Sequence, residues 1–97
     1  MLYIALGSLG RSEEAIAVCD EVITRFDQRE EVQLAEEVAK AMYNKGVALG
    51  SLGRSKEAIA VYDEVIARFG QREEVQIAEQ VAKAIFAKSM YGDEELS

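Results

Sequence analysis

Adjacent carboxylates are the residues whose types and spacing come closest to a metal-binding or acid–base site. Neighbouring positions on a helix point about 100° apart, so two such side chains do not converge on one ion or substrate. The sequence has no histidine and one cysteine, and it therefore lacks a ligand set for a transition metal. We expect ion pairs along a helix, as between Glu36 and Lys40 or Glu79 and Lys83, and no cofactor. The adjacent carboxylates are Glu30/Glu31, Glu36/Glu37 and Glu73/Glu74.

Cys19 is the one residue with the chemistry of a strong nucleophile. The sequence holds no histidine that could activate it, and Cys19 falls within an apolar helical pattern. We therefore expect a small core residue at this position. A single cysteine excludes an internal disulfide, so a reducing, cytoplasmic location is the simpler interpretation.

The segment "LGSLGRS" has the glycine content of a phosphate-binding loop and occurs twice, at Leu6–Ser12 and Leu49–Ser55. It lacks the lysine-serine/threonine ending of that loop and follows no predicted strand. Two copies 43 positions apart are better explained as the turn of a repeated unit. Because the sequence offers neither a nucleophile–base pair nor a phosphate loop, it predicts that the protein is not an enzyme.

The overall composition indicates a small helical domain. The chain has 97 residues, 49% of them apolar, and no proline. Its net charge of −7 argues against nucleic acid and anionic membranes as partners, since both require a basic surface. No apolar run approaches the roughly 20 residues that span a bilayer.

The repeat sets the architecture. Residues 6–48 align with residues 49–91 without a gap, and 31 of the 43 aligned positions are identical. A fixed period of this length is typical of stacked repeats, in which each unit completes its core against its neighbours. We accordingly predict one domain over 1–97. Its parts are a truncated repeat (1–29), a complete repeat (30–72), a lone terminal helix (73–91) and a tail (92–97).

Two helical patterns alternate within each repeat. Apolar residues of the second copy fall at three- and four-residue spacing on one face of a helix. Gly10 and Gly53 can end one helix in the left-handed conformation, and Ser12 and Ser55 can cap the next. The loops are short, so consecutive helices form antiparallel hairpins. The sequence thus predicts an all-α fold of about five helices, near 1–9, 13–26, 30–51, 56–69 and 73–91.

From Ala41 the chain reads "AMYNKGVALGSLGRSKEAIAVYDEVIARFG", which closely resembles the tetratricopeptide repeat. Gly46 takes the place of the small residue at the helix crossing, Gly53 that of the turn glycine, and Tyr62 that of the aromatic residue on the second helix. The period of 43 exceeds the family's usual 34, and Lys45 and Lys88 stand where the family usually has leucine. The resemblance implies an α-solenoid fragment with a right-handed superhelical twist.

The same resemblance implies a concave groove that binds a peptide or helix of a partner protein. Asn44 is the most suggestive groove position, because an amide there often holds a ligand backbone in this family. A solvated surface role for Asn44, and burial of the apolar groove residues against a neighbouring unit, are the alternatives. The groove residues carried over from the family are Lys40, Tyr43, Asn44, Val47, Lys83, Phe86 and Met90.

Self-association is the alternative function. The first and last helices lack a full repeat on one side, so a second copy could cover their apolar faces by end-to-end stacking or helix exchange. The protein would then be a structural homo-oligomer of two or more chains. The residues expected in such contacts are Leu2, Ile4, Leu6, Leu9, Val81 and Ile85.

Overall fold

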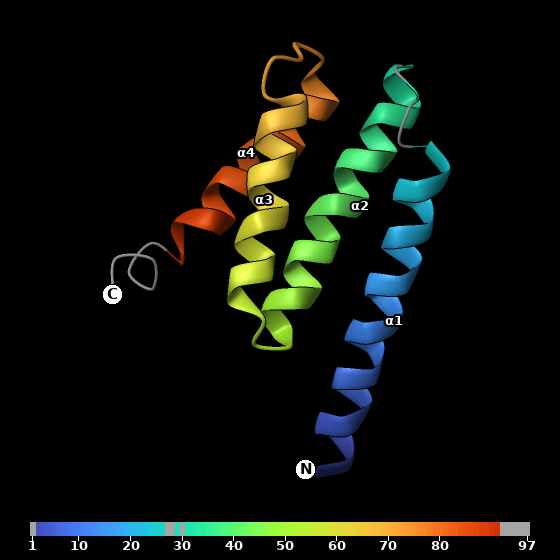
Figure 1. Cartoon of the computed structure of the whole chain (residues 1–97), viewed down its shortest axis with the longest axis vertical. Helices are drawn as coiled ribbons and strands as arrows, with labels where there is room; N and C mark the ends of the chain where they lie inside the picture. The colour runs from blue at the N-terminus through green and yellow to red at the C-terminus, as the bar shows by residue number, and fades with distance from the viewer. Residues whose placement is uncertain (1, 27–28, 30, 92–97) are drawn as a thin grey trace.

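The part of the chain that the structure describes consists of four helices. The computed structural model describes residues 2–26, 29 and 31–91, and for residues 2–10 it describes the backbone. The helices run in a row (Figure 1), and α2 and α4 also contact each other. Within this part of the chain no strand is present, and no helix is long and apolar enough to cross a membrane. The helices are α1 (Leu2–Phe26), α2 (Val32–Ser51), α3 (Ser55–Phe69) and α4 (Val75–Ser89).

The prediction of five helices was wrong at the first "LGSLGRS". Residues 2–26 form one continuous helix, so Gly10 lies inside α1 and Ser12 caps nothing. A glycine permits a left-handed turn but does not require one, and the helical conformation is equally open to it. The N-terminal half of α1 extends past the α2–α3 turn, where no described helix lies beside it to stabilise a reversal (Figure 1).

The second "LGSLGRS" does form the predicted turn. Gly53 has φ of +77°, the left-handed conformation, and the backbone N–H of Arg54 donates to the carbonyl of Leu49 at 2.9 Å. Ser55 is the first residue of α3 and not its cap. The Arg54 guanidinium donates to Glu57 at 2.8 Å, so an ion pair closes the first helical turn where the hydroxyl cap was expected.

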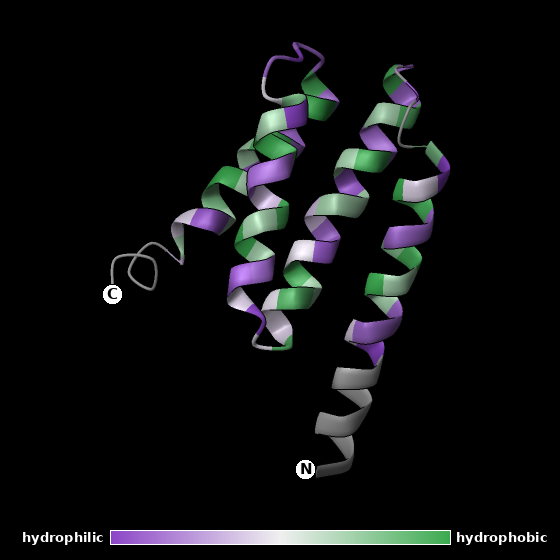
Figure 2. Cartoon of the chain, in the orientation of Figure 1, coloured by the Kyte–Doolittle hydropathy of each residue, from purple (hydrophilic) through white to green (hydrophobic). Residues whose placement is uncertain are grey.

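The core lies between α2, α3 and α4. Hydrophobic and hydrophilic bands alternate along each helix (Figure 2), as amphipathic helices in a packed layer require. Tyr62 is 2% exposed and Gly46 lies against its ring: a Cβ added at Gly46 would come within 2.7 Å of the Tyr62 Cζ. Only a glycine lets these two helices approach so closely. The other buried members of this core include Val38, Met42, Leu49, Val65, Phe69, Ile77 and Ala84.

One ion pair recurs at each junction between repeats. Lys45 of α2 lies 2.7 Å from Asp20 of α1, and Lys88 of α4 lies 2.6 Å from Asp63 of α3. Both partners of the second pair stand 43 positions after those of the first. The junction of α1 with α2 therefore repeats that of α3 with α4. Cys19 is buried at the first of these junctions, as expected, and burial raises the pKa of its thiol, with a smaller contribution from Asp20.

Candidate interaction surface

The candidate groove is the face on which α2 and α4 lie side by side. The ammonium group of Lys83 on α4 lies 5.8 Å from the centre of the Tyr43 ring on α2, a cation–π contact. The fold thus brings together two residues that are 40 positions apart in the sequence. This contact joins the α2 and α4 parts of the predicted groove into one surface.

The remaining residues of the predicted groove are exposed. Lys40 pairs with Glu36 at 3.2 Å, so the predicted i,i+4 ion pair is confirmed. Asn44 is exposed, and Val47 retains 45% of its accessible surface. Phe86 on α4 is 67% exposed, and Met90, directly after α4, is 72% exposed. The face therefore combines two ammonium groups and an amide with apolar side chains that a partner could cover.

Three tyrosines tie this surface to the core beneath it. The Tyr62 ring of α3 lies 6.0 Å from that of Tyr43 and 6.5 Å from that of Tyr91, centre to centre. The Tyr91 hydroxyl sits against Gly50 of α2, and a side chain at Gly50 would collide with it. Burial raises the pKa of Tyr62 to about 12, with smaller contributions from Tyr91 and Tyr43. Tyr62 therefore stays neutral beneath the predicted groove at ordinary pH.

Two cavities lined by described residues lie on the other side of α2. They have volumes of about 320 and 360 Å³ and open between α1 and α3. On α2 they are lined by Met42, Lys45 and Leu49, which point away from the face carrying Lys40 and Asn44. Neither cavity is lined by a residue of the predicted groove. Among the described residues, no three histidine, cysteine or acidic side chains gather as a metal site would require.

The residues predicted for self-association divide into three groups. The side chains of Leu2, Ile4, Leu6 and Leu9 lie outside the described part of the structure. Val81 is 9% exposed and belongs to the core of this chain. Ile85 is 53% exposed, so it remains accessible to a partner.

Comparison with known families identifies one segment. A family model described as tetratricopeptide repeat matches residues 39–69, which comprise most of α2, the turn and α3. Residues 39–69 are a tetratricopeptide repeat. Such repeats are typically non-enzymatic modules for protein–protein interaction. Neither the curated proteins nor the solved structures yield a match to this chain.

Sequence reasoning missed two features around this repeat. The ion pairs at the junctions could have been found, because Asp20/Asp63 and Lys45/Lys88 are identical in both copies. The contact of Tyr91 with Gly50 carried no such signal, since Tyr91 aligns with an alanine in the first copy. Comparison of the two copies can therefore predict contacts that occur in both repeats, but not a contact that occurs in one repeat alone.

Proposed function

We propose that this chain is a protein-interaction module that binds a peptide or helix of a partner on the α2–α4 face. The observation that carries the proposal is the contact of Lys83 with Tyr43. It joins α2 and α4, each the first helix of its repeat, into one surface. Exposed Asn44 can hydrogen-bond an extended backbone, and the apolar Phe86 and Met90 can bury a partner's side chains. The ammonium groups of Lys40 and Lys83 favour an acidic segment.

Comparative capture tests this proposal. The wild-type chain and the variant K40A/N44A/K83A are used as baits, and the bound proteins are compared by mass spectrometry. The matched control is R11A/K56A, which removes two positive charges from exposed positions on α1 and α3. We expect partners that bind the wild type and the control but not the groove variant. Partners retained equally by all three baits would show that the groove assignment is wrong.

Self-association is the second candidate function, and the exposure of Ile85 favours it. In the repeat register, Ile85 corresponds to Met42, which is 2% exposed beneath α3. Light scattering over a hundredfold range of concentration tests this candidate. A mass that rises with concentration supports it, and a constant monomer mass contradicts it.

A further inference from the structure

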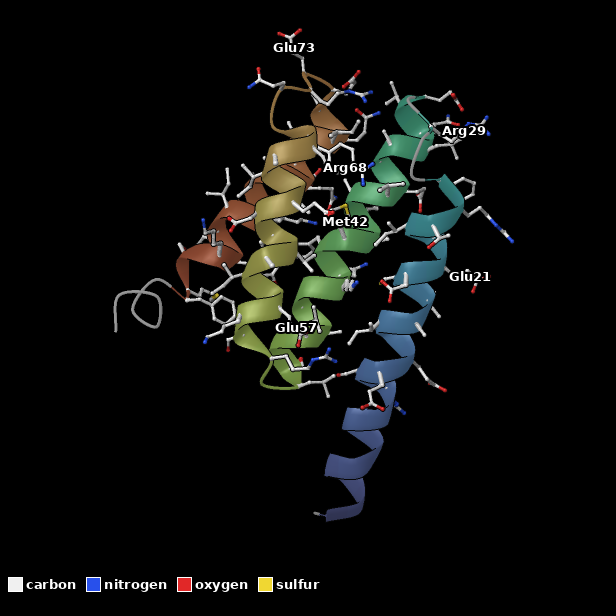
Figure 3. The ribbon with its side chains drawn as sticks, viewed as in Figure 1. Glu21, Arg29, Met42, Glu57, Arg68 and Glu73 are labelled. Carbon is white, nitrogen blue, oxygen red and sulfur yellow. The ribbon has the colours of Figure 1, made fainter. Side chains whose placement is uncertain are left out.

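Helix α4 exposes the face that α2 buries under α3. Met42 contacts α3 through the Arg68 guanidinium, 4.0 Å from its sulfur (Figure 3), and Gly46 contacts α3 through the Tyr62 ring. Ala35 and Ala39 continue this buried stripe at helical spacing, and all four residues are buried. The residues 43 positions later on α4 are all exposed: Ala78, Ala82, Ile85 and Ser89.

Helix α1 carries the complementary face. The buried stripe of α3 contains Ala58, Tyr62, Val65 and Phe69, each at most 5% exposed, and Tyr62 in this stripe contacts Gly46 of α2. Their counterparts on α1 are Ala15, Cys19, Val22 and Phe26, and all but Cys19 are only half-buried. The Asp20–Lys45 pair holds α1 on α2 as Asp63–Lys88 holds α3 on α4. α1 therefore corresponds to α3 in the repeat. Its face with Ala15, Cys19, Val22 and Phe26 is less completely covered than the equivalent face of α3.

Side-chain sizes at the crossing point favour a match between these two faces. Inside the chain the crossing joins the smallest residue, Gly46, to a large one, Tyr62. The corresponding residues on the two open faces are Ser89 and Cys19, of which one is larger than glycine and the other smaller than tyrosine. The two size changes are opposite in sign, so the side chain that Ser89 adds fills part of the space that the smaller Cys19 leaves.

A second contact can recur across the same junction. The Lys83 ammonium lies over the Tyr43 ring, and the equivalent residues one repeat away are Lys40 and Phe86. If a second copy continues the row of helices after α4, its Lys40 reaches the ring of Phe86. Phe86 is 67% exposed, and its ring can accept the same cation–π contact.

We propose that α4 of one copy binds the 12–26 segment of α1 of a second copy, in the geometry in which α2 binds α3. This rests on the self-association proposed above and names its partner segment. The contact joins two different surfaces, so it is heterologous and adds copies in a row until the row closes. Each added copy extends the row by four helices in the same order. The α2–α4 faces of successive copies then form one continuous surface. α1 and α4 lie at opposite ends of one copy (Figure 1), so a copy cannot make this contact with itself.

Disulfide trapping tests the geometry. In S89C the new thiol lies where Gly46 faces Tyr62, so it meets Cys19 of the next copy. Mild oxidation should produce a ladder of covalent oligomers, at least about tenfold faster than in M90C. M90C is the matched control, because Met90 directly follows Ser89 and is 72% exposed, but its side chain points in another direction. C19S/S89C should lose the ladder. Equal rates for S89C and M90C would overturn the proposal.

Complementation between two blocked variants tests the head-to-tail arrangement. A82E places a charge on the exposed α4 stripe, and V22E places one on the α1 face; circular dichroism checks that each folds. Each variant alone should be monomeric, while an equimolar mixture should form a 1:1 dimer through the one intact pair of faces. A15E replaces V22E if the latter unfolds. If V22E still forms a dimer alone, the contact is symmetric and the proposal fails.

The outcomes also separate this proposal from self-association in general. A monomer at every concentration overturns both. Concentration-dependent assembly without the bond between positions 19 and 89 leaves self-association standing and overturns the pairing of α4 with α1. Loss of partner capture by K40A/N44A/K83A tests the α2–α4 groove, and light scattering of the same variant shows whether loss of the Lys40–Phe86 contact has also changed the assembly.

Discussion

The ammonium group of Lys88 on α4 lies 2.6 Å from the carboxylate of Asp63 on α3, and the pair is a copy of Lys45 with Asp20. The tetratricopeptide pattern usually has leucine at both lysine positions. In this chain an ion pair crosses the repeat junction at a place where apolar packing is usual. The lysine side chains are 28% and 35% exposed, so each can bury its methylenes at the junction while its charge meets a partner.

A double-mutant cycle at the second junction should measure this pair. We expect D63N and K88M to be coupled by about 0.2–1 kcal/mol, because half-exposed ion pairs of this kind contribute little in water. Urea unfolding of the two single variants and the double variant gives the coupling. The coupling should shrink in 1 M salt, which screens exposed charges. A coupling of zero would mean that the lysine stem, and not its charge, stabilises the junction.

The two copies of "LGSLGRS" show what sequence can and cannot predict. Both contain the residues of a turn, and only the second becomes one, because Leu49 is buried there at 2% exposure and α3 packs back on α2. The helical periodicity around Tyr62 and Met42 was sufficient to predict the packing of this hairpin. The face that joins Tyr43 to Lys83 was expected from the family resemblance alone. Periodicity within one helix cannot predict that α2 and α4, which are separated by α3 in the chain, lie side by side.

Alanine at the two equivalent glycines should therefore have opposite effects on stability. G53A forces a side chain into φ of +77° and should cost about 1 kcal/mol of unfolding free energy. G10A lies within a helix and should stabilise the chain by about 0.5–1 kcal/mol, since alanine loses less entropy there. Chemical denaturation followed by circular dichroism measures both. A destabilising G10A would indicate that the first copy also turns.

Gly46→Ala should reveal how closely α2 and α3 approach. The new methyl group meets the Tyr62 ring, and overpacking typically costs about 1–3 kcal/mol. The gain in helix propensity, about 1 kcal/mol, offsets part of that cost, so we expect a net loss of roughly 1 kcal/mol. In the Y62L background the clash is absent, and the same substitution should stabilise. Equal effects of the substitution in the wild type and in Y62L would contradict the close contact between Gly46 and the Tyr62 ring.

Tyr62 should make the fold sensitive to alkali. Its pKa is raised to about 12 by burial, from an ordinary value of 10.0. The neutral phenol is the form that the folded state favours, so its full contribution is present below pH 10 and is lost as the pH rises through 12. A rise of this size corresponds to at most roughly 2–3 kcal/mol of unfolding free energy. Urea titrations between pH 9 and 12 measure the loss.

Y62F is the matched control for this pH dependence, because it keeps the buried ring and removes the ionisable hydroxyl. Y62F should retain more of its stability than the wild type between pH 10 and 12, and the two proteins should differ least near neutral pH. The difference between the two pH profiles isolates Tyr62, because the other tyrosines are present in both proteins. Parallel profiles would mean that the Tyr62 hydroxyl reaches water at the edge of the α2–α3 contact.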